Sequence, residues 1–264
     1  MLIKDSVAIV NCAETDFGLC IARECLKSGL KAVSLLHTDI KNGSRSLLIL
    51  EKEFGKSKTI FINTDLVTEA EIEMAMKKTV DAFGSVDIVI YSPEMFRNKP
   101  QVTVGMNLNE ATVGVRDLLA IDKYLSKWKN GEEGVIVNIS YSTVFNDDCP
   151  STNSNVISLC EYLSSISHYR ATGIKILTLN PGYVGTSLCL NIARKVLPSA
   201  RYQQVMQRLW GNLYQQKIEL IAKAIVRILA EFETGDVWLV EENLCCQIEN
   251  RSTSNSEKLK KFYL

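Results

Sequence analysis

Residues 134–140 read Gly-Val-Ile-Val-Asn-Ile-Ser, a nearly continuous apolar run that follows a long stretch with helical patterning. A run that is apolar at consecutive positions, rather than at alternate ones, is typical of a strand buried on both faces of a parallel sheet. Six further short runs share this character and are predicted as strands: Val7–Val10, Ala32–Leu36, Thr59–Asn63, Val86–Tyr91, Ile174–Leu179 and Asp236–Val240.

Helical patterns separate these strands. Thr68, followed by Glu71, is a capping-box signal at the start of one of them. Regular strand–helix alternation predicts an α/β fold: a single doubly wound, Rossmann-like domain over residues 1–250, with a seven-stranded, mainly parallel sheet and helices on both faces. A polar tail at 251–264 is expected to fray in part. The helical segments are expected near 18–28, 41–54, 68–83, 109–128, 154–170 and 217–233.

Composition excludes several classes of protein. The 264 residues are 46% hydrophobic, and 30 basic residues balance 30 acidic ones, so charge gives no reason to expect nucleic acid or an anionic membrane as a partner. No run approaches the roughly 18 apolar residues of a membrane span, and residues 1–5 lack the pattern of a signal peptide. The eight cysteines form no C-x-x-C pair and only two histidines occur, which predicts no metal site and a reducing, cytoplasmic location.

Five segments, in this order and spacing, resemble the short-chain dehydrogenase/reductase family, and most closely its branch of insect alcohol dehydrogenases and 15-hydroxyprostaglandin dehydrogenases. This resemblance implies an NAD(H)-dependent oxidoreductase that acts on an alcohol or ketone. It also implies a homodimer formed through the helices at 111–129 and 154–170. The five segments are Glu51–Gly55, Asp81–Ile90, Asn130–Ser140, Asn180–Gly182 and Gly235–Val240.

The family's phosphate-binding turn, Thr-Gly-x-x-x-Gly-x-Gly, corresponds here to Asn11-Cys-Ala-Glu-Thr-Asp-Phe-Gly18. Only Gly18 is kept, beside Phe17, while Cys12 and Asp16 replace the other two glycines. Asp16 would place a side chain and a negative charge where the family holds a pyrophosphate. The alternative is an ordinary strand-to-helix turn in which Asp16 stabilises the helix N-terminus.

Of the family's other cofactor-binding motifs, some are altered in this sequence and others are intact. His37 stands where NAD-dependent relatives carry a ribose-binding aspartate, and Asp39, two residues on, is a candidate substitute or a solvated loop residue. The family's Asn-Asn-Ala-Gly becomes Tyr91-Ser-Pro-Glu94. Two matches are intact, and they give as candidate cofactor contacts Asp65 and Leu66 after the third strand, and Pro181, Gly182 and Thr186 after the sixth.

The family's catalytic tyrosine and lysine are missing. In the resemblance Ser140, or alternatively Ser142, matches the catalytic serine, but Cys149 stands at the tyrosine position and Asn153 at the lysine position. Asn109, or Asn107 in a competing alignment, matches the supporting asparagine. The sequence holds no Tyr-x-x-x-Lys, although the family needs the lysine charge one helical turn from the phenol to lower its pKa.

Three hypotheses follow. The first is a pseudoenzyme that keeps the scaffold for binding, storage or dimerisation and holds NAD(H) or no cofactor. The second is an active NAD(P)-dependent oxidoreductase with an unusual proton donor. The third is a carrier of an apolar small molecule, held by a helical lid insertion at 187–216.

Overall fold

The computed structural model places most of the predicted elements, and several connecting segments are not described. The structure describes residues 3–11, 16–64, 68–92, 108–139, 159–181, 217–241, 243–248 and 260–264, with side chains omitted for 108–113.

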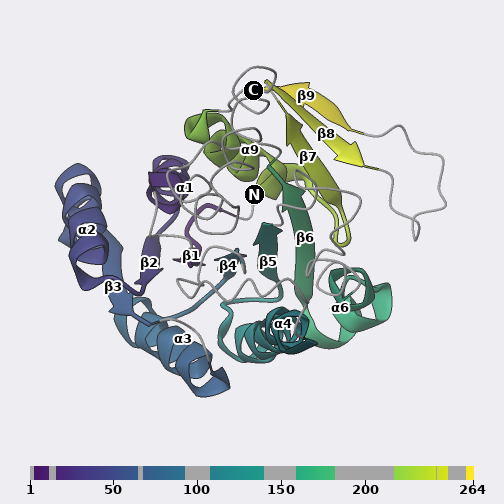
Figure 1. The fold of residues 1–264 in the computed structure, drawn as a ribbon, viewed down its shortest axis with the longest axis horizontal. Helices are drawn as coiled ribbons and strands as arrows, with labels where there is room; N and C mark the ends of the chain where they lie inside the picture. The colour runs from purple at the N-terminus through teal and green to yellow at the C-terminus, as the bar shows by residue number, and fades with distance from the viewer. Residues whose placement is uncertain are drawn as a thin grey trace, which may run out of the picture.

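Within these ranges the strands form one sheet in the order β3-β2-β1-β4-β5-β6-β7-β8-β9 (Figure 1). The first seven strands are parallel, and β8 and β9 are added antiparallel to the edge at β7. The strands are β1 (Val7–Val10), β2 (Ala32–His37), β3 (Thr59–Asn63), β4 (Ile88–Tyr91), β5 (Gly134–Ile139), β6 (Ile174–Asn180), β7 (Val237–Glu241), β8 (Leu244–Ile248) and β9 (Lys261–Tyr263).

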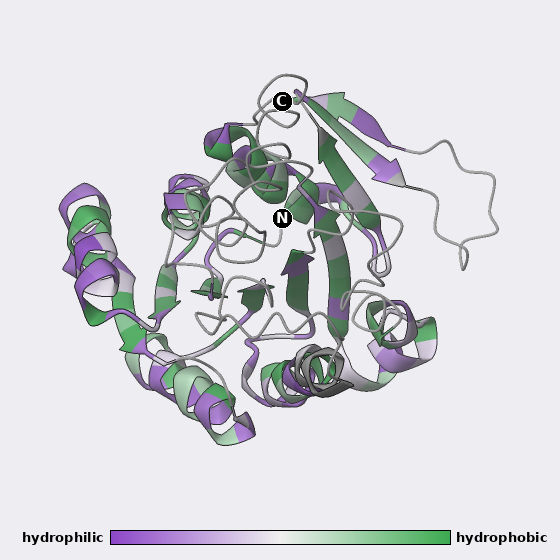
Figure 2. Ribbon diagram, in the orientation of Figure 1, coloured by the Kyte–Doolittle hydropathy of each residue, from purple (hydrophilic) through white to green (hydrophobic). Residues whose placement is uncertain are grey.

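Helices cover both faces of the sheet, so the predicted doubly wound fold is confirmed (Figure 1). One layer contains α1 (Asp16–Lys27), α2 (Ile40–Phe54) and α9 (Ile218–Glu231). The other contains α3 (Glu69–Phe83), α4 (Leu108–Trp128), a helical stretch at 159–163 and α6 (Ile166–Thr172). Each layer packs on its own apolar core, and Figure 2 shows the hydrophobic strands between helices with mixed surfaces.

The chain order reverses between β1 and β4, because β2 and β3 lie on one side of β1 and β4 to β7 on the other. Such a switch point leaves a crevice at the carboxyl ends of the central strands, where α/β sheets hold their ligands. The predicted capping box is also present: Thr68 Oγ1 accepts from the N–H of Glu71, and the Glu71 carboxylate accepts from the N–H of Thr68.

The prediction of seven strands was wrong, because the described chain forms nine. Three-residue β9 lies in the segment that was expected to be a polar tail, and it is too short to give a periodic signal. Phe262 holds it in place, since its ring contacts Trp238, with the centroids 5.5 Å apart, and lies under the Arg227 guanidinium. Phe262 and Leu264 therefore extend the apolar core beyond residue 250.

The helix predicted near 154–170 is also interrupted. Residues 159–163 are helical, Ser164 and Ser165 leave the helix, and α6 begins at Ile166. The Ser165 hydroxyl accepts from the N–H of His168 and so caps α6, which is the role in which serine is most favourable. The other predicted elements agree with the structure to within about two residues at either end.

Asp87 joins the amino ends of the three central strands. Its carboxylate accepts hydrogen bonds from the N–H of Val7 (2.8 Å), the hydroxyl of Ser85 (3.0 Å) and the N–H of Asn130 (2.7 Å). Its own backbone bonds to Val7 in β1 and to Val135 in β5. The Asp87 side chain is buried, and so are its hydrogen bonds to Val7 and Ser85, so these two donors have no ready access to water.

Replacing Asp87 by alanine should lower the free energy of unfolding by about 3 kcal/mol, because it leaves the buried N–H of Val7 and the partly buried N–H of Asn130 without an acceptor. Urea denaturation followed by far-ultraviolet circular dichroism measures this loss. Exposed Asp81→Ala is the matched control and should change stability by less than about 0.5 kcal/mol. Equal stability of the two variants would show that Asp87 does not hold the strands together.

Candidate functional site

The carboxyl ends of the central strands carry a row of polar side chains. Asn11 follows β1, and its N–H donates to the carbonyl of Ile90 at 3.1 Å. Tyr91 of β4 is paired with Asn138 of β5, which is paired with Thr178 of β6. The four residues Asn11, Tyr91, Asn138 and Thr178 thus lie at one level across four neighbouring strands, and we call them the polar row.

The polar row faces the layer that contains α3 and α4. Side chains alternate between the faces of a strand, and Ile9, Val89 and Ile136, two residues earlier in β1, β4 and β5, pack in the core under those helices. This face of the sheet is therefore apolar one level before the polar row, and its side chains become polar only at the carboxyl edge.

Tyr91 is tied to α4 instead of pointing into the crevice. Its hydroxyl donates to Asp117 at 2.8 Å, and both atoms are buried. The other oxygen of Asp117 accepts from the Arg116 guanidinium at 2.7 Å, which balances the buried charge. This pair was not foreseen from the sequence, although an aspartate within the apolar stripe of a helix was a signal for it.

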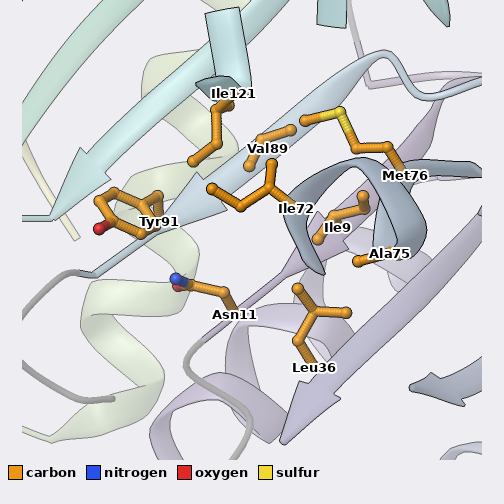
Figure 3. Close-up of a pocket in the computed structure, with 9 residues that line it drawn as sticks. All are labelled: Ile9, Asn11, Leu36, Ile72, Ala75, Met76, Val89, Tyr91 and Ile121. Carbon is orange, nitrogen blue, oxygen red and sulfur yellow. The ribbon is translucent and has the colours of Figure 1, made fainter. Parts of the chain in front are cut away.

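Beneath Asn11 and Tyr91 lies a small internal cavity, shown in Figure 3. Its volume is about 10 Å³, and apart from these two residues its lining is apolar. A cavity of that size holds at most one water molecule. It is not the ligand site. Seven apolar side chains complete the lining: Ile9, Leu36, Ile72, Ala75, Met76, Val89 and Ile121.

At the end of β2, His37 and the candidate ribose-binding residue Asp39 are engaged within their own turn. The His37 ring is buried, and its Nδ1 accepts from the N–H of Asp39 at 2.7 Å. The Asp39 carboxylate caps α2, where it accepts from the N–H of Lys41 (2.7 Å) and of Asn42 (3.1 Å). The hydrogen bonds from Asn42 and Lys41 lower the pKa of Asp39, so it is ionised at neutral pH.

At the start of α1, the residues of the predicted turn that pack the helix against the sheet are buried. Gly18 and Phe17 are both buried, and the Phe17 side chain lies in the core under α1 and α9. Asp16 is exposed in the first turn of α1, where its negative charge interacts favourably with the helix dipole. Pro181 is buried at the end of β6.

The remaining candidate site residues lie outside what the structure describes. Asn109 is within α4, but its side chain is not described. The predicted lid at 187–216 is likewise outside the described residues. The other predicted residues outside them are Asn107, Ser140, Cys149, Asn153, Asp65, Leu66, Gly182 and Thr186.

Two tyrosines lie beside lysines, but neither is prepared to lose a proton. Tyr169 donates to Glu133, and its ring lies 5.5 Å from the Lys175 ammonium. Both contacts are at the amino ends of β5 and β6, at the opposite edge of the sheet from the polar row. The hydrogen bond to Glu133 raises the pKa of Tyr169. Burial, and then the hydrogen bonds to Glu73 and Glu69, raise the pKa of Tyr124 next to Lys123. A catalytic phenol needs the opposite shift.

Three of the five described cysteines are buried packing residues. Burial raises the pKa of Cys25, Cys160 and Cys245 to about 12 in each case, so these thiols stay protonated and unreactive. In the ranges that the structure describes, no group of histidine, cysteine and carboxylate side chains is arranged to hold a metal. No helix in those ranges is long and apolar enough to span a membrane.

Comparison with known proteins identifies relatives along most of the chain. A family model described as short chain dehydrogenase matches residues 6–196. The chain is 26% identical over 205 residues to 15-hydroxyprostaglandin dehydrogenase [NAD(+)] of Rattus norvegicus, and the match covers 74% of each protein. It is 21% identical over 216 residues to alcohol dehydrogenase 2 of Ceratitis capitata, with 80% of this chain and 82% of the relative covered.

A solved structure shares the fold. Levodione reductase superposes with a TM-score of 0.73, at 16% identity, over 90% of this chain and 96% of that one. An identity this low supports the fold alone. The residues that determine the chemistry are those at the carboxyl edge.

The capping of α2 by Asp39 leads to a testable expectation. Asp39→Ala should lower the melting temperature by a few degrees, whereas Asp39→Asn, which keeps a capping oxygen, should lose much less. Because the pKa of Asp39 is lowered on folding, its contribution is complete at neutral pH and is lost as the pH falls through that lowered value. Calorimetry at pH 7 and at pH 3 tests both points. A loss equal for the two variants at pH 7 would contradict the cap.

Proposed function

The chain belongs to the short-chain dehydrogenase family, and we propose that it keeps this family's scaffold as a binding protein without catalysing hydride transfer. The observation that carries the proposal is the absence of Tyr-x-x-x-Lys from all 264 residues. A phenol with no cation one helical turn away keeps a pKa near 10, and at neutral pH it exchanges a proton poorly with an alcohol.

The described side chains support this proposal. At the carboxyl edge, the phenol of Tyr91 donates to the Asp117 carboxylate, so this hydroxyl is engaged within the protein. Tyr124 and Tyr169 lie next to lysines, but neighbouring glutamates raise the pKa of both hydroxyls. None of these three tyrosines is poised as a general acid or base.

The dinucleotide that the family implies is NAD(H), and the described residues on the adenosine side do not fit it. The Asp39 carboxylate is occupied by the N–H groups of α2, and the buried His37 ring is bonded to the backbone of Asp39. The carboxylate of Asp16 stands at the N-terminus of α1, where a pyrophosphate would meet repulsion. We therefore assign no chemical step to a nicotinamide cofactor.

An active NAD(P)-dependent oxidoreductase is the second candidate. Two observations favour it: the intact sequence Pro181-Gly-Tyr-Val-Gly-Thr186, and relatives named as dehydrogenases. A carrier of an apolar small molecule stays a proposal that depends on residues 187–216. For any of these roles, the buried, unpaired thiols accord with a reducing compartment such as the cytosol.

The purified chain should not reduce NAD⁺ or NADP⁺ with secondary alcohols, and NADH fluorescence should not change on addition of protein. The double variant Cys149→Tyr, Asn153→Lys should remain inactive, because the positions of the phosphate turn and the ribose carboxylate are also altered. Absorbance at the nicotinamide band measures the first result and fluorescence titration the second.

Turnover by the unmodified chain would overturn the proposal. Binding of NADH without turnover would leave the non-catalytic role standing and refute only the misfit of the cofactor. A relative with an intact Tyr-x-x-x-Lys, assayed beside the chain, provides the positive control.

We also propose a homodimer through the face formed by α4, residues 159–163 and α6. This face exposes three large apolar side chains: Leu119 at 47%, Tyr162 at 73% and Ile166 at 65%. A hydrogen bond between the His168 ring and the Asp122 carboxylate, 2.9 Å apart, links α6 to α4. An apolar surface of this kind on adjacent helices suits contact with an identical copy.

The double variant Leu119→Asp, Ile166→Asp should convert the dimer to a monomer, because each dimer would bring four carboxylates into an apolar contact. Light scattering coupled to size-exclusion chromatography measures the mass. Leu48→Asp, on the equally exposed surface of α2, is the control and should leave the dimer unchanged. A monomeric unmodified chain would refute the proposed interface.

A further inference from the structure

Asn138, at the centre of the polar row, has a side chain with nothing to bind. It is fully buried, and neither its Oδ1 nor its Nδ2 has a hydrogen-bond partner in the structure described here. Its neighbours in the row do have partners: Tyr91 donates to Asp117, and Thr178 hydrogen-bonds the Cys160 thiol. In the row, Asn138 is thus the residue whose amide has both its donor and its acceptor unpaired.

Two further atoms nearby share this condition. Asn11 uses its Oδ1 to accept from the N–H of Ser92 at 2.8 Å, but its Nδ2 is unpartnered, and so is the Oγ of Ser92. Both residues are fully buried. Asn11 and Ser92 directly follow β1 and β4, and Asn138 is the next-to-last residue of β5, so all three lie at the carboxyl ends of adjacent strands. Buried polar atoms are nearly always paired in folded proteins, so a group of four unpaired ones indicates a missing partner.

The chemistry of the row limits what that partner can be. A carboxamide offers both a donor and an acceptor, so its best match is a group that also does both. Among the described residues, the neighbours of Asn138 in the row are uncharged, and the nearby Asp117 carboxylate is paired with Arg116. These described residues offer an ion no counter-charge for its lost hydration, so they favour an uncharged group over a carboxylate or a phosphate.

We propose that Asn138 anchors a binding site for an uncharged ligand group that both donates and accepts hydrogen bonds, either a carboxamide or a hydroxyl. The ligand group forms two hydrogen bonds with the Asn138 amide, and the Nδ2 of Asn11 and the Oγ of Ser92 line the same edge. The inference deepens the proposed binding role by naming the ligand chemistry. Its failure would leave the absence of turnover untouched.

The direct test is a titration with acetamide, ethanol, acetone and sodium acetate, followed through the side-chain NH₂ signals in ¹H–¹⁵N spectra. The Asn138 signal, identified by its absence from Asn138→Leu, should shift saturably with acetamide or with ethanol, which decides between carboxamide and hydroxyl. Acetone, which only accepts, and acetate, which is charged, should bind at least about tenfold more weakly, the cost of one lost hydrogen bond.

Asn63→Leu is the matched control, because the Asn63 amide already donates to the carbonyls of His37 and Thr38. This variant should lose stability but keep the binding of the probe, whereas Asn138→Leu should lose the probe. A second measurement allows for any change in stability caused by Asn138→Leu. The melting temperature is recorded with and without the favoured probe, which should raise it for the unmodified chain and leave it unchanged for Asn138→Leu.

Three results would overturn the proposal. One is an Asn138 signal that no probe shifts. Another is a shift of equal size with acetate or acetone. The third is a crystal structure grown with the favoured probe in which only an ordered water contacts the Asn138 amide.

Discussion

The carboxylate of Asp87 is the contact on which the arrangement of the central sheet depends. It links β1, β4 and the turn before β5 by hydrogen bonds at the amino edge. These bonds fix the register of the three strands, and therefore which residues lie at the carboxyl edge. The alignment of Asn11, Tyr91 and Asn138 at one level is a consequence. A parallel sheet buried on both faces leaves only that edge for polar chemistry, so the amino edge determines the geometry of the site.

The fold was predictable because its signals are local and repeated. Continuous apolar runs such as Val135–Ile139 identified the parallel strands, and Thr68 with Glu71 identified the start of α3. The segments that were missed depend on contacts made far along the chain. Lys261–Tyr263 becomes a strand because Phe262 meets Trp238 and Arg227, and nothing within three residues encodes this. The break at Ser165 was hidden because helical periodicity continues on both sides of it.

The candidate site was only partly predictable, for a different reason. A residue missing from a motif can be recognised directly in the sequence, so the missing tyrosine and lysine could be named at once. A new hydrogen-bonded pair cannot be recognised in this way, because Tyr91 and Asp117 are 26 positions apart, on a strand and a helix. The role of Asp39 could not be decided from the sequence either. Its position suggested a ribose-binding residue or a solvated loop residue, whereas in the structure its carboxylate caps the first turn of α2. The family fold together with the altered residues at its carboxyl edge is what the proposed non-catalytic role rests on.

Hydride transfer itself is the most direct test of this account. The chain is incubated at high concentration with NADH deuterated at the transferable position and a set of ketones, and mass spectrometry then follows the label over many hours. We expect no deuterium in any alcohol product above the level of a protein-free control. Label transferred in proportion to the amount of protein would contradict the account, because it would require a proton donor at the carboxyl edge.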